Sequence, residues 1–150
     1  AVRDRLILGL MLEAGMRPSE IVALKRLHVV REAARLTVGD RTLFLSHALW
    51  ERLCTWSKPL RVSQRLFDLS VRQITNIVAG YGRRAGMART VAPDMLRRTF
   101  AWRAFPAHLK TLEDLAAHLG ISPRYAVRYL EDHTIGGDPA ASEKDLAHAS

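Results

Sequence analysis

The chain has 150 residues and 48% of them are hydrophobic, which suits one globular domain with its own core and excludes a chain that is disordered as a whole. Its 23 Lys and Arg residues against 15 Asp and Glu residues give a net charge of +8, which favours a polyanionic partner, most simply nucleic acid. Cys54 is the single cysteine, so an intrachain disulfide is excluded, and neither a bilayer-length apolar run nor a signal peptide is present; we expect a cytoplasmic protein without a membrane partner.

The first third of the chain predicts two helices followed by short strands. Residues 3–16 have a helical pattern that ends at Gly15, and residues 19–27 predict a second helix with Pro18 in its first turn. The period then changes, and residues 27–30, 35–38 and 42–45 are β-prone. Gly39-Asp40 predicts a hairpin turn between the last two of these strands.

The remainder predicts helices only. Ser46 is a candidate cap for a helix over 47–57, and Ser70 with Gln73 predicts a capping box for a helix to about residue 85. Further helices are expected over 94–102 after Pro93, from Thr111 through Leu119, and from Ser122-Pro123 to about Glu131. The predicted fold is mostly α with a small antiparallel β-sheet. Residues 1–133 would form one domain, and residues 134–150 a C-terminal tail, disordered or exchanged between protomers.

Arg17 is the most informative single residue, because it is an isolated positive charge between an apolar helix and an amphipathic one. An arginine is always charged and presents a planar fork of donors that suits a phosphate. The alternative is that Arg17 only caps the preceding helix and pairs with Glu13 or Glu20, but its segment favours phosphate binding.

Three segments resemble the catalytic domain of the tyrosine site-specific recombinases, the phage integrases and their relatives. They are Gly15-Met16-Arg17-Pro18-Ser19-Glu20, Ala92 to Ala101 with its Leu96-Arg97-Arg98-Thr99-Phe100-Ala101 core, and Leu115 to Ser122 leading to Arg128-Tyr129-Leu130. The resemblance runs from about residue 3 to residue 131 and implies the tyrosine-recombinase catalytic-domain fold.

The resemblance implies cleavage and rejoining of duplex DNA through a 3′-phosphotyrosyl intermediate. Arg17 and Arg97 would bind the scissile phosphate, His118 would be the late histidine of the family pattern, and Tyr129 would be the nucleophile. Neither a metal nor another cofactor is implied, because the arginines supply the positive charge. Because family members act as tetramers, a homo-oligomer on DNA is also implied.

The sequence departs from the family pattern at the groups that move protons. Asp94 stands where the family has histidine or lysine, and the hairpin carries Arg41 but no lysine. A carboxylate repels a phosphate, and arginine is a poor proton donor. The spacing after His118 leaves both Tyr125 and Tyr129 open as nucleophile, with Arg128-Tyr129-Leu130 favouring Tyr129.

Two alternatives therefore stay open beside the enzyme. One is a recombinase fold that binds DNA or regulates without cleaving it, and the other is a helix-turn-helix over residues 115–130. A metal site at His108, His118 and His133 is rejected, because their spacing fits no ligand pattern. The predicted DNA-binding residues are Arg17, Arg41, Arg97, Arg98, Arg124 and Arg128.

Overall fold

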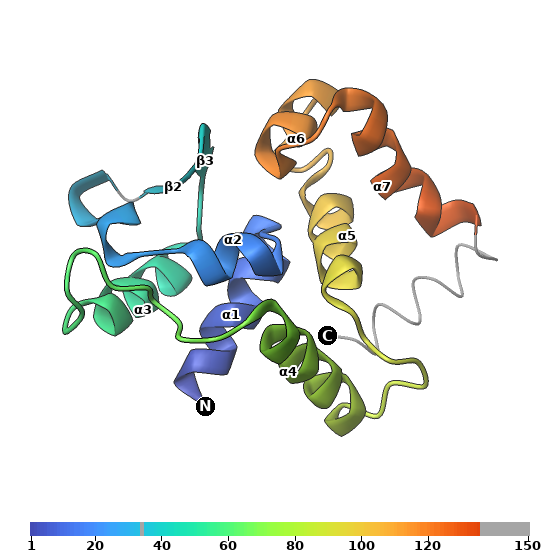
Figure 1. Cartoon of the computed structure of the whole chain (residues 1–150). Coiled ribbons are helices and arrows are strands. Elements are labelled where there is room, and N and C mark those ends of the chain that lie inside the picture. The colour runs from blue at the N-terminus through green and yellow to red at the C-terminus, as the bar shows by residue number, and fades with distance from the viewer. Residues whose placement is uncertain (34, 136–150) are drawn as a thin grey trace.

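The computed structural model describes residues 1–33 and 35–135, which form seven α-helices and one small sheet (Figure 1). The helices are α1 (Val2–Ala14), α2 (Pro18–Ala23), α3 (His47–Ser57), α4 (Val71–Arg84), α5 (Pro93–Ala104), α6 (Leu112–Leu119) and α7 (Pro123–Ile135). The predicted fold class is thereby confirmed. Of the predicted tail, residues 134 and 135 belong to α7, and residues 136–150 lie outside the described part.

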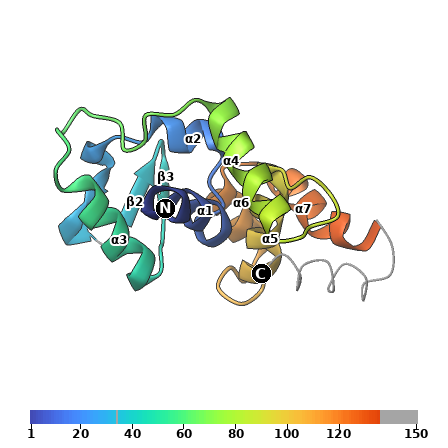
Figure 2. The same ribbon diagram turned by 90° about the horizontal axis from the view of Figure 1, so that it is seen from below.

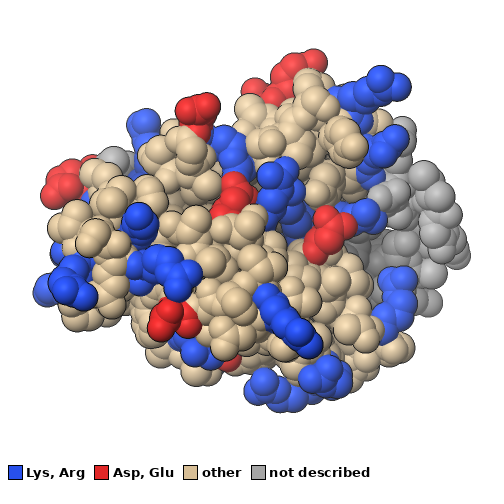
Figure 3. All heavy atoms as spheres, viewed as in Figure 1, with Lys and Arg blue, Asp and Glu red and all other residues tan. Residues whose placement is uncertain are grey.

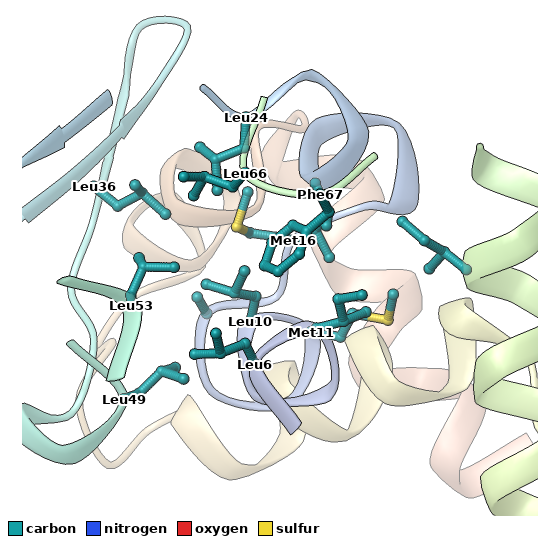
Figure 4. Packing of buried hydrophobic residues seen from close by; sticks show 14 of the residues in the cluster. Leu6, Leu10, Met11, Met16, Leu24, Leu36, Leu49, Leu53, Leu66 and Phe67 are labelled. Atoms are coloured by element: carbon teal, nitrogen blue, oxygen red, sulfur yellow. The ribbon is translucent and has the colours of Figure 1, made fainter. Parts of the chain in front are cut away.

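Helix α1 is the centre of the molecule, between the sheet and α3 on one side and α5 on the other (Figures 1 and 2). Leu6, Ile7, Leu10 and Met11 are almost completely buried, so the apolar residues cover much more than one stripe of this helix. Figure 4 shows Leu6 and Leu10 among side chains from the sheet, from α3 and from the segment before α4. Burying each such side chain stabilises the fold by about 1.5–3 kcal/mol.

A second core cluster joins α5, α6 and α7. Phe100, Leu115, Leu119 and Ala126 are buried there, and the ring of Tyr129 packs against them. The position of α7 relative to α1 therefore depends on α5 and α6, which lie between them (Figure 1).

The sheet is antiparallel in the order β1-β2-β3, with β1 (Val29–Val30), β2 (Arg35–Val38) and β3 (Arg41–Leu43). Val38 pairs with Arg41, which leaves Gly39 and Asp40 as the two-residue turn that was predicted. This register buries Leu36 and Leu43 against the core and places Arg41 at the tip of the hairpin.

The second helix is shorter than predicted. It ends at Ala23, and Leu24 and Lys25 are extended. The carbonyl of Leu24 accepts the N–H of Leu66 at 2.8 Å, and Arg26 donates to Gln64 at 2.9 Å. Pairing with this distant segment replaces helical hydrogen bonds, so residues 26–28 form only a short 3-10 turn.

The structure confirms the predicted helix caps Ser46 and Ser70 and shows a further cap at Thr111. Ser46, Ser70 and Thr111 each accept an N–H in the first turn of their helices. Cys54 is buried on α3, and burial raises the pKa of its thiol. Between residues 1 and 135, leaving out residue 34, no helix is both long enough and apolar enough to span a bilayer.

Candidate active site

A cleft of about 610 Å³ opens where the N-termini of α2 and α5 meet the turn between α6 and α7. Its wall is mixed: two arginines, one aspartate and two tyrosines stand among apolar and small side chains. The lining residues are Arg17, Pro18, Ser19, Val71, Pro93, Asp94, Arg97, Ile121, Ser122, Tyr125 and Tyr129.

The junction between α1 and α2 places Arg17 at this cleft. Gly15 ends α1 with φ +67°, which glycine adopts without strain, and a Cβ there would lie 2.4 Å from the Phe100 ring. The Glu20 carboxylate accepts the main-chain N–H of Arg17 at 2.9 Å and so fixes the first turn of α2. Among the described residues no hydrogen bond or ion pair occupies the Arg17 guanidinium, so its donors are available to a ligand.

Arg97 reaches the cleft from the inside of the molecule, and only 4% of it is exposed. Its Nε donates to the carbonyl of Gly15 at 2.8 Å, and its Nη2 donates to the carbonyl of Leu119. Burial is the main reason why the pKa of Arg97 lies below its ordinary value, and the charge of Arg17 adds to this effect. Contact with Tyr129 opposes the decrease without cancelling it. Arg97 therefore ties α5 to the ends of α1 and α6 while one edge of its guanidinium faces the cleft.

The hydroxyl of Tyr129 lies between Arg97 and Asp94. Arg97 Nη1 donates to it at 3.1 Å, and the hydroxyl donates to Asp94 Oδ1 at 3.3 Å. The second carboxylate oxygen of Asp94 is 2.9 Å from Arg98 Nε, one turn further along α5. A nucleophile candidate, a buried cation and a carboxylate thus meet at one oxygen atom.

Arg41 does not line the cleft. Its Nη2 forms an ion pair with the other oxygen of Glu20, and its Nη1 donates to the carbonyl of His118. Burial, with the charges of Arg97 and Arg17, lowers the pKa of Arg41 to about 10. The hairpin arginine therefore connects α2 to the C-terminus of α6, where a cation also complements the helix dipole.

His118 lies behind the cleft and not in it. Its ring stacks on Phe100 with centroids 4.9 Å apart, and its Nε2 is 3.0 Å from the carbonyl of Ala14. Burial lowers its pKa from the ordinary value, so the imidazole is neutral at neutral pH. The lining position belongs instead to Ile121, directly after the Leu119-Gly120 pair of the family pattern.

The structure thus brings Arg17, Arg97 and Tyr129 of the predicted catalytic set to one cleft and leaves His118 outside it. Tyr125, the other nucleophile candidate, also lines the cleft and is 57% exposed. Of the predicted DNA-binding residues, Arg98 borders the site through Asp94, whereas Arg124 and Arg128 are exposed on α7.

Sequence reasoning did not give Glu20 its joint role with Arg41. The spacing from Arg17 to Glu20 predicts the capping contact of the Glu20 carboxylate. It does not predict the ion pair with Arg41, because that hairpin residue lies far away in the sequence. Across the described chain no group of three or more His, Cys, Asp or Glu side chains could hold a metal ion.

Comparison with known proteins gives consistent matches over most of the chain. The model of the phage integrase family matches residues 1–133. Tyrosine recombinase XerC from two strains of Escherichia coli O157:H7 is 28% identical over 165 aligned positions, which include 99% of this chain and 54% of the relative. The chain therefore spans about half the length of the curated relatives that it matches.

Two solved structures share the fold. XerA recombinase superposes with a TM-score of 0.78 at 20% identity, over 99% of this chain and 57% of that one. The Tn1549 transposon integrase, solved in complex with a circular intermediate DNA, gives a TM-score of 0.64 at 14% identity, over 84% and 52% of the two chains.

Proposed function

The chain belongs to the phage integrase family, and on that premise we propose that it cleaves and rejoins duplex DNA through a covalent phosphotyrosyl intermediate. The observation that carries the proposal is the meeting of Arg17, Arg97 and Tyr129 at one cleft. Arg17 directly precedes α2, whereas Arg97 lies on α5 and Tyr129 on α7, so the three come together through the tertiary fold and not through local sequence.

The two arginines suit the binding of a phosphodiester. Arg17 offers its guanidinium donors from one wall, and Arg97 lines the cleft with its Nη1 directed at the Tyr129 hydroxyl. Positive charge fixed in advance stabilises the extra negative charge of a pentacoordinate phosphorus. In enzymes that stabilise transition-state charge with fixed donors, removing one donor lowers the catalytic rate by about 10²–10³-fold.

Tyr129 is the proposed nucleophile. Its hydroxyl oxygen would form the new bond to phosphorus, the bond from phosphorus to the 5′-oxygen would break, and the 5′-hydroxyl of a second strand would later reverse the step. The hydrogen bond from Arg97 places the attacking oxygen beside a group that also binds the phosphate. Holding two reacting groups in place in this way accounts for a large part of the rate acceleration in bimolecular reactions.

Arg41 and His118 have supporting roles in this proposal. Arg41 holds the last turn of α6, and His118 packs between α1 and α5, so both orient the segment that leads into α7. Neither residue lines the cleft, and neither is proposed to contact the scissile phosphate.

Duplex DNA is the proposed partner. Arginine and lysine side chains are spread over the face that Figure 3 shows, with fewer acidic side chains between them, and the net charge of the whole chain is +8. The integrase with the related fold was solved on DNA. A homo-oligomer on the DNA is proposed from the family alone.

A second candidate function is DNA binding without cleavage. Two features favour it: His118 lies behind the cleft, and a carboxylate lines the cleft where the family has a proton-carrying side chain. The two functions differ in one measurable product, the covalent protein–DNA adduct.

The test begins with duplexes of randomised sequence that are enriched for binding to the protein. Bound sequences are rebuilt as nicked suicide duplexes, in which the short leaving strand dissociates after cleavage and traps the intermediate. We expect an adduct that survives denaturation by detergent. DNA binding with no adduct on any enriched sequence would show that the second candidate is correct.

A further inference from the structure

Asp94 is in contact with the proposed nucleophile. It is the second residue of α5 and stands at the mouth of the cleft, with its side chain 55% exposed. One of its oxygens lies 3.3 Å from the Tyr129 hydroxyl, and the other pairs with Arg98 at 2.9 Å. The ion pair with Arg98 leaves the first oxygen directed at the tyrosine.

The hydrogen bonds fix the direction of the Tyr129 proton. A guanidinium has only donors, so Arg97 donates to the hydroxyl oxygen and cannot accept from it. The hydroxyl has one proton, and among the described residues the remaining partner of that oxygen is the carboxylate of Asp94. The proton therefore points at Asp94 before any DNA arrives.

Phosphate binding would strengthen the carboxylate as a base. A second negative charge close to a carboxylate disfavours its ionised form, and the phosphate would occupy the same cleft as Asp94. Transfer of the proton from Tyr129 to Asp94 removes this repulsion at the moment when the tyrosine oxygen attacks. The repulsion that argues against Asp94 in a phosphate site thus becomes part of the driving force.

We propose that Asp94 is the proton acceptor for Tyr129 in DNA cleavage, an inference that rests on the proposed function. The Tyr129 proton moves to Asp94 Oδ1, the tyrosine oxygen bonds to phosphorus, and the bond to the 5′-oxygen breaks with its electron pair. The 5′-oxygen takes a proton from water. In the reverse step the protonated Asp94 returns its proton to the leaving tyrosine oxygen.

A carboxylate that only repels DNA makes a different prediction. Removing its charge would tighten binding and would leave cleavage equal or faster. A proton acceptor predicts a split: Asp94→Asn binds DNA equally or more tightly but forms the adduct about 10²–10⁴-fold more slowly. A merely structural role would weaken both.

The experiment measures single-turnover adduct formation and, separately, binding for the full chain on one enriched nicked duplex. Wild type, Asp94→Asn and Asp68→Asn are compared. Asp68 is a matched control, because it is also an exposed aspartate paired with a nearby arginine, Arg65, and it lies outside the cleft. We expect the split for Asp94→Asn and wild-type behaviour for Asp68→Asn.

A second readout reports on the proton itself. A fluorinated tyrosine, whose phenol ionises more readily, is placed at position 129 of the Asp94→Asn variant. It should raise the rate of adduct formation by that variant at least tenfold. An unchanged or faster rate in Asp94→Asn, a parallel loss of binding, or no rescue by the fluorinated residue overturns the proposal for Asp94 and leaves the proposed function intact. A wild-type chain that binds but forms no adduct overturns both.

Discussion

The Nη1 of Arg97 donates a hydrogen bond to the hydroxyl of Tyr129 across 3.1 Å, although the two residues lie on different helices. The rest of the same guanidinium is bound to the main chain of Gly15 and Leu119. Arg97 on α5 therefore connects the C-terminal ends of α1 and α6 to the residue proposed to attack DNA. The stability of the fold and the proposed cleavage step depend on the same side chain.

This double attachment predicts that the two arginines of the cleft respond differently to substitution. Arg97→Gln leaves two buried carbonyls without their donor and should lower the free energy of unfolding by about 2–4 kcal/mol. Arg17→Gln should lower it by less than about 1 kcal/mol, because no hydrogen bond of its side chain is lost within the described residues. Urea unfolding measures both.

Adduct formation should still depend on both arginines. On an enriched nicked duplex, Arg17→Gln should slow the reaction by about 10²–10³-fold with the fold intact. Equal stability losses for the two variants would contradict the structural part of this account. Wild-type cleavage by Arg17→Gln would contradict its role at the phosphate.

The tight junction before Arg17 predicts a large effect from a single methyl group. Gly15→Ala adds a Cβ that would lie 2.4 Å from the Phe100 ring, at a residue whose φ is +67°. Gly39→Ala is the matched control, because its φ of +59° is similar but no atom of the described residues lies within 4 Å of the added atom. Gly39→Ala should cost about 1 kcal/mol from backbone strain, and Gly15→Ala should cost at least about 2 kcal/mol more from overpacking. Equal midpoints in thermal unfolding would show that the packing argument is wrong.

The half-buried imidazole of His118 predicts how stability depends on pH. Burial lowers its pKa below the ordinary value of 6.5, so the unfolded chain binds a proton more readily than the folded chain does. Its contribution is therefore present above pH 6.5 and is lost as the pH falls from 6.5 through the lowered folded pKa. Urea midpoints at pH 7.5 and at lower pH should show this loss in the wild type, and the loss should be smaller in His118→Gln.

His47→Gln provides the matched control substitution, because this histidine is exposed at the start of α3. If His118→Gln and the wild type lose the same stability on acidification, His118 is not the group that titrates.

Arg17, Arg97 and Tyr129 could be predicted because each lies in a short segment that resembles the family pattern. The glycine, proline and capping signals around Arg17 also predict the conformation that the structure shows there. The pattern around His118 does not identify the residue that faces the cleft, since the structure puts Ile121 there, directly after the Leu119-Gly120 pair. The turn between α6 and α7 joins two partly buried helices. Helical spacing alone does not predict which of its residues lines the cleft.

The contacts of Arg41 could not be read from the sequence. Its partners Glu20 and His118 lie on α2 and α6, and only the packing of the hairpin against both helices brings them together. The same limit applies to Asp94. Its residue type predicts repulsion of a phosphate, whereas its position beside the Tyr129 hydroxyl points to a use for that charge.

Identifying the modified residue in the covalent adduct tests the central claim most directly. Trypsin cuts after Arg124, Arg128 and Lys144, so Tyr125 and Tyr129 fall on different peptides. After nuclease digestion of the trapped adduct, mass spectrometry should find the nucleotide on the peptide that begins with Tyr129, and Tyr129→Phe should abolish the adduct while DNA binding persists. A nucleotide on the Tyr125 peptide, or an adduct that survives Tyr129→Phe, would contradict the account.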